Sequence, residues 1–151
     1  MLKIDLKKIL ADFGMTFDLE LAFDPNGVCA LTLNEETPII IQMNEEDSSL
    51  TLSSTLRKSL PEPLGLKHVE NLLALALDPM ERGGASPVAG RDAESGYMVL
   101  YMVLTPSVLD KTPLAEVFEA FVATRDAVVA MLDEPVEAPI PFGDQFSRLW
   151  V

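Results

Sequence analysis

The residues that carry most enzyme chemistry are scarce in this sequence. His68 is the only histidine and Cys29 the only cysteine, so no His/Cys set has the spacing of a metal site. A single cysteine excludes an intrachain disulfide and is typical of a reducing compartment. Neither a Gly-rich phosphate loop nor a nucleophile elbow occurs. We therefore predict no catalytic residue, no metal site and no cofactor.

Three enzyme-like or metal-binding alternatives stay open from the residues alone. Cys29 and His68 could in principle pair, although a cysteine in an apolar strand pattern is usually a buried, inert thiol. His68, near a helix start, is more typical of a surface or helix-start residue. The acidic runs at 35–36 and 45–47 lack the twelve-residue EF-hand spacing, which favours solvated turns over Ca²⁺ ligands. An acidic hydrolase would need a carboxylate pair, and nothing selects one from the 24 Asp and Glu residues.

Positive charge is also scarce. Eleven Lys and Arg residues face 24 Asp and Glu, which gives a formal net charge of −13. Nine of the carboxylates lie between Ile9 and Leu56, a stretch without Lys or Arg. Such a charge repels phosphate backbones and anionic lipid, so we expect neither nucleic acid nor a membrane surface as a partner. We identify no signal peptide and no apolar run of about 20 residues, and expect a cytoplasmic protein.

Apolar residues, in contrast, are abundant at 48% of the 151 residues. A chain of this length buries about 68–70% of its unfolded surface and folds without a disulfide or metal. The apolar periodicity predicts an α+β domain with an antiparallel sheet and three helices, in the order helix, three or four strands, helix, two strands, helix. The expected helices are 2–13 ended by Gly14, 66–78 ended by Pro79, and one from Thr112 to 132. The expected strands are 28–34, 38–44, 49–57, 85–91 and 97–104, with 17–23 extended before a turn at 24–27.

Two features of this pattern bear on partners. The consecutive isoleucines 39–41 predict a strand buried on both faces. The helix at 66–78 is apolar nearly all round, which favours a dimer, although core packing would explain it as well. We divide the chain into a domain at 1–132 and a Pro-rich, apolar tail at 133–151.

The order of elements resembles the class I type III secretion chaperones, the family of the Tir chaperone. The resemblance covers about residues 2–132. The segments that carry it are ILADFG, DPNGVCALTL, PIIIQMNEED, SSLTLSSTL before a proline-rich turn, ENLLALAL, GGA, ESGYMVLYMVL and TPLAEVFEAFVATRDAVVAML. It implies a protomer with the element order α-β-β-β-α-β-β-α. It further implies a bacterial cytoplasmic homodimer that binds the N-terminal segment of a secreted effector without ATP and keeps it soluble.

The resemblance also implies where the partners bind. Cargo would bind apolar patches on the first helix and the sheet, for which the candidates are Leu6, Leu10, Phe13, Leu31, Leu33, Ile39, Ile41 and Leu52. The protomers would pair through the second helix and the last two strands, with candidates Leu72, Leu73, Leu75, Ala76, Val88, Val99 and Tyr101. Pro87 and the long tail depart from the family pattern. The alternatives are a regulator of the same fold that sequesters another chaperone or an anti-activator, and a stand-alone dimeric stress or sensory protein.

Overall fold

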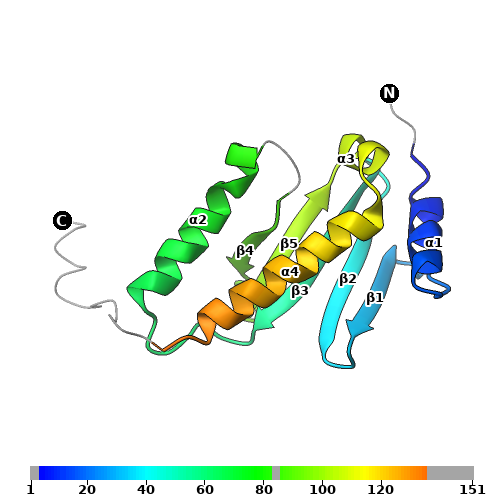
Figure 1. Cartoon of the computed structure of the whole chain (residues 1–151). Coiled ribbons are helices and arrows are strands. Elements are labelled where there is room, and N and C mark those ends of the chain that lie inside the picture. The colour runs from blue at the N-terminus through cyan, green and yellow to red at the C-terminus, as the bar shows by residue number, and fades with distance from the viewer. Residues whose placement is uncertain (1–3, 83–85, 136–151) are drawn as a thin grey trace.

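The computed structural model describes residues 4–82 and 86–135, except the side chains of 77–82. These residues form an α+β fold built on an antiparallel sheet, as the sequence predicts (Figure 1). The elements in chain order are α1 (Leu6–Thr16), β1 (Val28–Leu33), β2 (Thr37–Asn44), β3 (Ser49–Arg57), α2 (Leu66–Arg82), β4 (Val88–Arg91), β5 (Met98–Leu104), α3 (Pro106–Lys111) and α4 (Leu114–Leu132). The expected order is therefore confirmed, with one short helix added.

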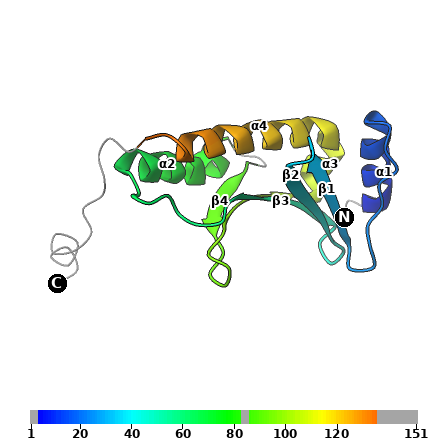
Figure 2. The same ribbon diagram turned by 90° about the horizontal axis from the view of Figure 1, so that it is seen from below.

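The sheet has the strand order β1-β2-β3-β5-β4, and every neighbouring pair is antiparallel. All the helices lie on one side of it, with α4 across the middle, α2 beside α4 near β4, and α1 at the β1 end (Figure 2). No described segment covers the opposite face of the sheet. The fold thus has two layers, and the described residues leave one sheet face open.

Strand alternation decides which side chains enter the core between these layers. On β5, Met98, Leu100, Met102 and Leu104 are buried while the residues between them are not. Because successive side chains point to opposite faces, this alternation marks the helix-covered face.

The prediction that residues 39–41 are buried on both faces is wrong. Ile39 and Ile41 are fully buried, but Ile40 is 41% exposed. The reason is that helices cover only one face, so the middle isoleucine points to the open face.

Helix α4 supplies much of the core, and α1 packs against it. The side of α4 that faces the sheet is apolar, and its buried residues are Leu114, Val117, Phe118, Phe121, Val128 and Leu132. The ring of Phe118 lies 4.9 Å, centroid to centroid, from that of Phe13 on α1. This aromatic contact fixes α1 over the β1 end of the helix layer.

The first helix differs from its prediction at both ends. It begins at Leu6, where the Asp5 carboxylate accepts a hydrogen bond from the Lys8 N–H at 3.1 Å, and it continues past Gly14 to Thr16. Gly14 is buried inside the helix rather than at its end. A Cβ atom there would lie 2.7 Å from the Leu19 carbonyl oxygen, so the position needs glycine because the chain folds back closely against it.

The later helix boundaries also correct the prediction. Helix α2 does not end at Pro79 but carries it internally and continues to Arg82, although an internal proline removes one backbone hydrogen bond. The unexpected helix α3 is capped by Thr105, whose hydroxyl accepts from the Val108 N–H. Thr112 is consequently the C-cap of α3, and Pro113 occupies the N-cap of α4.

Residues 17–23 are an irregular connection rather than a strand, and the turn that follows is confirmed. The Gly27 N–H donates to the Asp24 carbonyl at 2.9 Å, and Gly27 has a φ of 77°. The Asp24 carboxylate also accepts from the Asn26 and Val28 N–H groups. These bonds hold the chain as it enters β1.

Candidate interaction surfaces

Cys29 and His68 do not form a catalytic pair. Cys29 lies on β1 and His68 on the first turn of α2, at opposite ends of the sheet (Figure 1). Cys29 is buried as expected; burial and, secondly, the Asp24 carboxylate raise the pKa of its thiol. His68 lies on the first turn of α2, which fits the expected helix-start position, but at 3% exposure it is not a surface residue. Its Nδ1 accepts from the Gly65 N–H at 3.2 Å. Both side chains are therefore held in structural roles.

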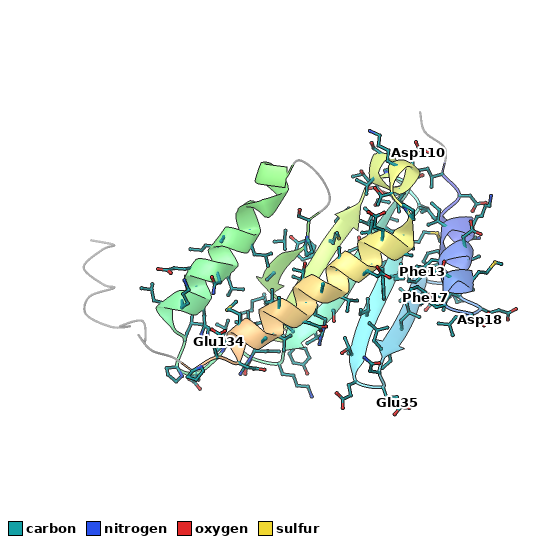
Figure 3. The ribbon with its side chains drawn as sticks, viewed as in Figure 1. Phe13, Phe17, Asp18, Glu35, Asp110 and Glu134 are labelled. Carbon is teal, nitrogen blue, oxygen red and sulfur yellow. The ribbon has the colours of Figure 1, made fainter. Side chains whose placement is uncertain are left out.

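The acidic runs lie in exposed hairpin turns. Glu35 and Glu36 follow β1, and residues 45–47 follow β2; all five carboxylates are exposed, with Glu35 at a hairpin tip (Figure 3). Among the described residues, no group of three or more His, Cys, Asp or Glu side chains is placed to hold a metal ion. Within the same ranges, no helix combines the length and apolarity needed to cross a membrane.

The structure corrects the expected exposure of the cargo-binding candidates. Six of them are buried in the protomer core and the other two are half-buried. The six are Leu6, Leu10, Phe13, Ile39, Ile41 and Leu52; the two are Leu31 and Leu33. The α1 candidates are buried because they face the core, where Phe13 meets Phe118 of α4. The strand candidates are buried because they lie on the helix-covered face of the sheet.

Exposed apolar side chains lie next to these buried ones. Met15 is 75% exposed at the end of α1, and Phe17 and Leu19 are also exposed on the connection after it. The rings of Phe17 and Phe13 meet edge to face at 5.2 Å, so the exposed residue is anchored on the buried one (Figure 3). We name Met15, Phe17 and Leu19 the α1 ridge.

A second exposed apolar area lies on the open face of the sheet. The strand registers align Ala30, Ile40, Ser53, Tyr101 and Val88 in one row across all the strands. Ile40 and Tyr101 are exposed, as is Val103 two residues further along β5. This row forms a continuous, mainly apolar band that the described chain leaves uncovered.

The outer edge of β1 is available for a further strand. The Met43 N–H donates to the Gly27 carbonyl at 2.7 Å, which sets the hydrogen-bonded positions of the β1–β2 pair. Since bonded and non-bonded pairs alternate along antiparallel strands, the backbone groups of Ala30 and Thr32 point away from β2. In the described part of the chain, β1 is the first strand of the sheet and has no neighbour on that side.

The predicted dimer residues lie on different sides of the molecule. On α2, Leu73 and Ala76 are exposed, whereas Leu72 and Leu75 are half-buried on the side toward α4. Val88, Val99 and Tyr101 lie on the open face of the sheet, where Tyr101 is exposed and the other two are half-buried. Pro87 directly precedes the short edge strand β4, so it lies outside the strand rather than within the expected range 85–91.

A groove runs between α2 and α4, with a volume of about 880 Å³. Its walls are mostly apolar and small: Leu72, Ala74 and Leu75 on α2, and Ala123, Ala127, Val128 and Met131 on α4. Lys67, Asn71, Thr124 and Glu134 add polar groups to its walls. Figure 2 shows the two helices side by side in the helix layer. We name this feature the α2–α4 groove.

Sequence reasoning missed the α1 ridge and the exposed Ile40. Phe17 and Leu19 alternate with Asp18 and Glu20, a pattern that predicts an extended segment and gives no sign of a turn. The signal that identifies the ridge is the left-handed Asp18, with a φ of 59°, which turns the chain at the end of α1. Only the packed structure reveals this turn.

The fold matches solved structures of secretion chaperones. A chain in the structure of the HopA1–SchA chaperone–effector complex is 22% identical with a TM-score of 0.65, covering 85% of this chain and 99% of that one. For a chain in the complex of the Yersinia pestis type III secretion chaperone SycH with a fragment of YscM2, the identity is 15% and the TM-score 0.63, covering 83% of this chain and 98% of that one. For a chain in the ExoU–SpcU complex of the Pseudomonas aeruginosa type III secretion system, the identity is 17% and the TM-score 0.62, covering 85% of this chain and 98% of that one.

No curated protein matches the sequence. The sequence profile of the Tir chaperone protein (CesT) family, however, matches residues 8–128, from the first turn of α1 to near the end of α4. This range contains every strand of the sheet and most of the helix layer. The chain therefore belongs to the Tir chaperone protein (CesT) family.

Proposed function

We propose that this protein is a non-enzymatic, ATP-independent chaperone of the bacterial cytoplasm that binds the N-terminal segment of a type III secreted effector. The observation that carries the proposal is an open β1 edge beside the α1 ridge, in a chain of the CesT family. The HopA1–SchA and ExoU–SpcU complexes, which share this fold, support it.

The binding mode we propose is strand addition. An extended effector segment would receive and donate backbone hydrogen bonds at Ala30 and Thr32, which supplies affinity without sequence preference. Its apolar side chains would contact Met15, Phe17 and Leu19, which supplies selectivity. The exposed carboxylates of the hairpin turns would keep the loaded complex soluble and favour an effector segment that carries basic residues.

We further propose that the protein acts as a homodimer. The support is the amount of apolar surface that one protomer leaves exposed, namely the outer side of α2 at Leu66 and Leu73 together with the open sheet face at Tyr101 and Val103. Large exposed apolar areas on a soluble protein mark interaction surfaces.

The β1 edge is tested with substitutions at Ala30 in the full chain, each expressed in the native host and used to co-purify the bound effector. Ala30→Pro removes an outward N–H without breaking a ladder bond to β2. Ala30→Val changes the side chain on the same face and keeps the N–H. We expect co-purification of the effector to be lost in Ala30→Pro and kept in Ala30→Val, with similar melting temperatures. Equal binding by both variants would exclude strand addition at this edge.

The same co-purification, done from the native host, separates the proposed role from its alternative. A secreted effector as the bound protein supports a cargo chaperone. A chaperone or transcriptional regulator as the bound protein favours the regulatory role of the same fold.

A further inference from the structure

The α2–α4 groove is separate from the surfaces assigned to effector binding. It opens between two helices of the helix layer, whereas the β1 edge and the α1 ridge lie at the other end of the sheet (Figure 1). Its apolar walls at Leu72, Leu75, Val128 and Met131 face a space of about 880 Å³. A mostly apolar groove of this volume, with a few polar groups on its walls, is a candidate binding site.

The proposed dimer contact uses a different side of α2 from the one that faces the groove. Leu66 and Leu73 are seven residues apart, so they share one side of the helix, and both are exposed. Neither residue lines the groove, whose α2 wall is formed by Leu72, Ala74 and Leu75. Pairing through the outer side of α2 would therefore leave the groove itself unfilled.

The chain leaves the described structure at the groove. Glu134 belongs to the groove lining, and the description ends one residue later, at Pro135 (Figure 3). A segment that follows Pro135 starts beside the groove and reaches it without crossing the rest of the protein. Attachment at this point makes docking intramolecular, which raises the effective concentration of the segment to about the millimolar range.

The following segment has the required length and composition. Residues 136–151 are 16 in number, and a chain of that length spans about 53–58 Å when extended. The 17-residue helix α2 is only about 25 Å long. The segment carries five large apolar side chains, Ile140, Phe142, Phe146, Leu149 and Trp150, which match the apolar walls of the groove.

We infer that residues 136–151 dock in the α2–α4 groove of their own protomer. The segment buries its apolar side chains against Leu72, Leu75, Val128 and Met131 and covers the inner side of α2. The outer side of α2 then remains for a second copy. This inference does not rest on effector binding, since it concerns a surface and a segment that the strand-addition mode does not use.

Trp150 makes the inference measurable in the full chain because it is the only tryptophan. We expect its emission in the native protein to be shifted to the blue of the urea-unfolded protein and to be protected from acrylamide. The double substitution Ala123→Glu and Ala127→Glu places two charges in the groove, at exposed positions of α4. It should move the Trp150 emission to the red and raise its quenching toward that of the unfolded chain.

The matched control puts the same charges on α4 outside the groove, at Ala120→Glu and Ala130→Glu, which are also exposed. This control should leave the Trp150 emission unchanged. Native emission as red as that of the unfolded chain, or an equal red shift in the control, overturns the inference. A shift that depends on protein concentration also overturns it, because the occupant would then come from a second copy.

A contact measurement keeps the inference testable if the charged groove variant unfolds. A nitroxide attached to Asn71→Cys at the groove wall should quench Trp150 in the folded protein, while buried Cys29 stays unlabelled. The same label at Glu119→Cys, an exposed residue of α4 outside the groove, should not. Equal quenching from the two sites, or none from Asn71→Cys, overturns the inference.

Discussion

Arg125 on α4 donates a hydrogen bond from Nε to the Ser54 hydroxyl on β3, at 2.8 Å. The same guanidinium donates from Nη2 to the Thr55 carbonyl at 3.3 Å, and the Ser54 hydroxyl donates a hydrogen bond to the Pro38 carbonyl at 2.8 Å. One side chain of the helix layer is thereby connected to two neighbouring strands. The side chain of Arg125 is only 13% exposed, so it is more shielded from solvent than that of Arg57, which is 30% exposed.

We expect Arg125→Met to lower the free energy of unfolding by about 1.5–3 kcal/mol, because it removes charge-assisted hydrogen bonds in a largely buried setting. Arg57→Met is the control, since it breaks the more exposed 2.9 Å ion pair with Asp133 and should cost about 0–1 kcal/mol. Urea unfolding of both variants provides the measurement. An equal loss in the two would contradict the role given to Arg125.

Gly14→Ala tests the close approach inside α1. Alanine would favour the helix by about 1 kcal/mol on propensity alone. However, its Cβ would lie 2.7 Å from the Leu19 carbonyl oxygen and 3.0 Å from Leu21 Cγ. We expect a net loss of about 1–3 kcal/mol in thermal or urea unfolding. Asp12→Ala, an exposed position in the same helix, should be neutral or slightly stabilising; a gain in stability for Gly14→Ala would refute the packing argument.

The thiol of Cys29 should make stability depend on pH in the alkaline range. Its pKa is raised above the ordinary value of 9.0, so the folded chain retains the proton after the unfolded chain has lost it. The contribution is therefore complete below pH 9.0 and is lost as the pH rises through the raised pKa. The free energy of unfolding, measured with urea below and above this pH range, should fall more steeply with pH in the native protein than in Cys29→Ala. An equal fall in both proteins would argue against a contribution from the Cys29 thiol.

Surface and core residues of α1 should separate binding from stability. Met15→Ser and Leu19→Ser change exposed side chains, so we expect weakened effector co-purification and little change in melting temperature. Leu10→Ala removes a fully buried side chain and should cost about 2–5 kcal/mol. The assignment of the α1 ridge fails if the two serine variants retain full effector binding.

Leu73→Glu tests the outer side of α2 as a dimer contact. Leu73 is 63% exposed in the protomer, so a charge there costs little in the fold but would be buried on pairing. We expect light scattering to give the mass of one protomer at micromolar concentration, against two for the native chain. Leu60→Glu, an exposed leucine outside the predicted interface, should keep the native mass. A dimeric Leu73→Glu variant would exclude this contact.

The strands were predictable because their signals are local. Residues 28–33, 37–44 and 49–57 are short segments rich in apolar residues and separated by acidic turns, and the structure has strands there. The helix ends were less predictable. Gly14 and Pro79 are common terminators, yet Gly14 serves a tertiary contact and Pro79 stays inside α2. Neighbours distant in sequence decide these positions, and no local pattern records them.

The candidate surfaces divide along the same line. A period of two determines that Ile39 and Ile41 share a face and that Ile40 has the other, but it does not determine which face the helices cover. Large apolar residues are found mostly in the core of a folded protein, so apolarity alone does not identify a binding surface. Most of the apolar cargo candidates are accordingly buried. Met15 and Ile40 became visible as surface residues only when α1 and α4 were in place.

By itself, the sequence determined the α+β order of elements, the acidic turns, the scarcity of histidine and cysteine and the resemblance to the secretion chaperones. These follow from composition and short-range periodicity, which each segment carries independently. Only the tertiary structure decided that the helices cover one sheet face, that β1 is an open edge, and that α2 and α4 enclose a groove where the tail begins. These features depend on contacts between segments far apart in the chain, and periodicity fixes the faces of an element without fixing their partners.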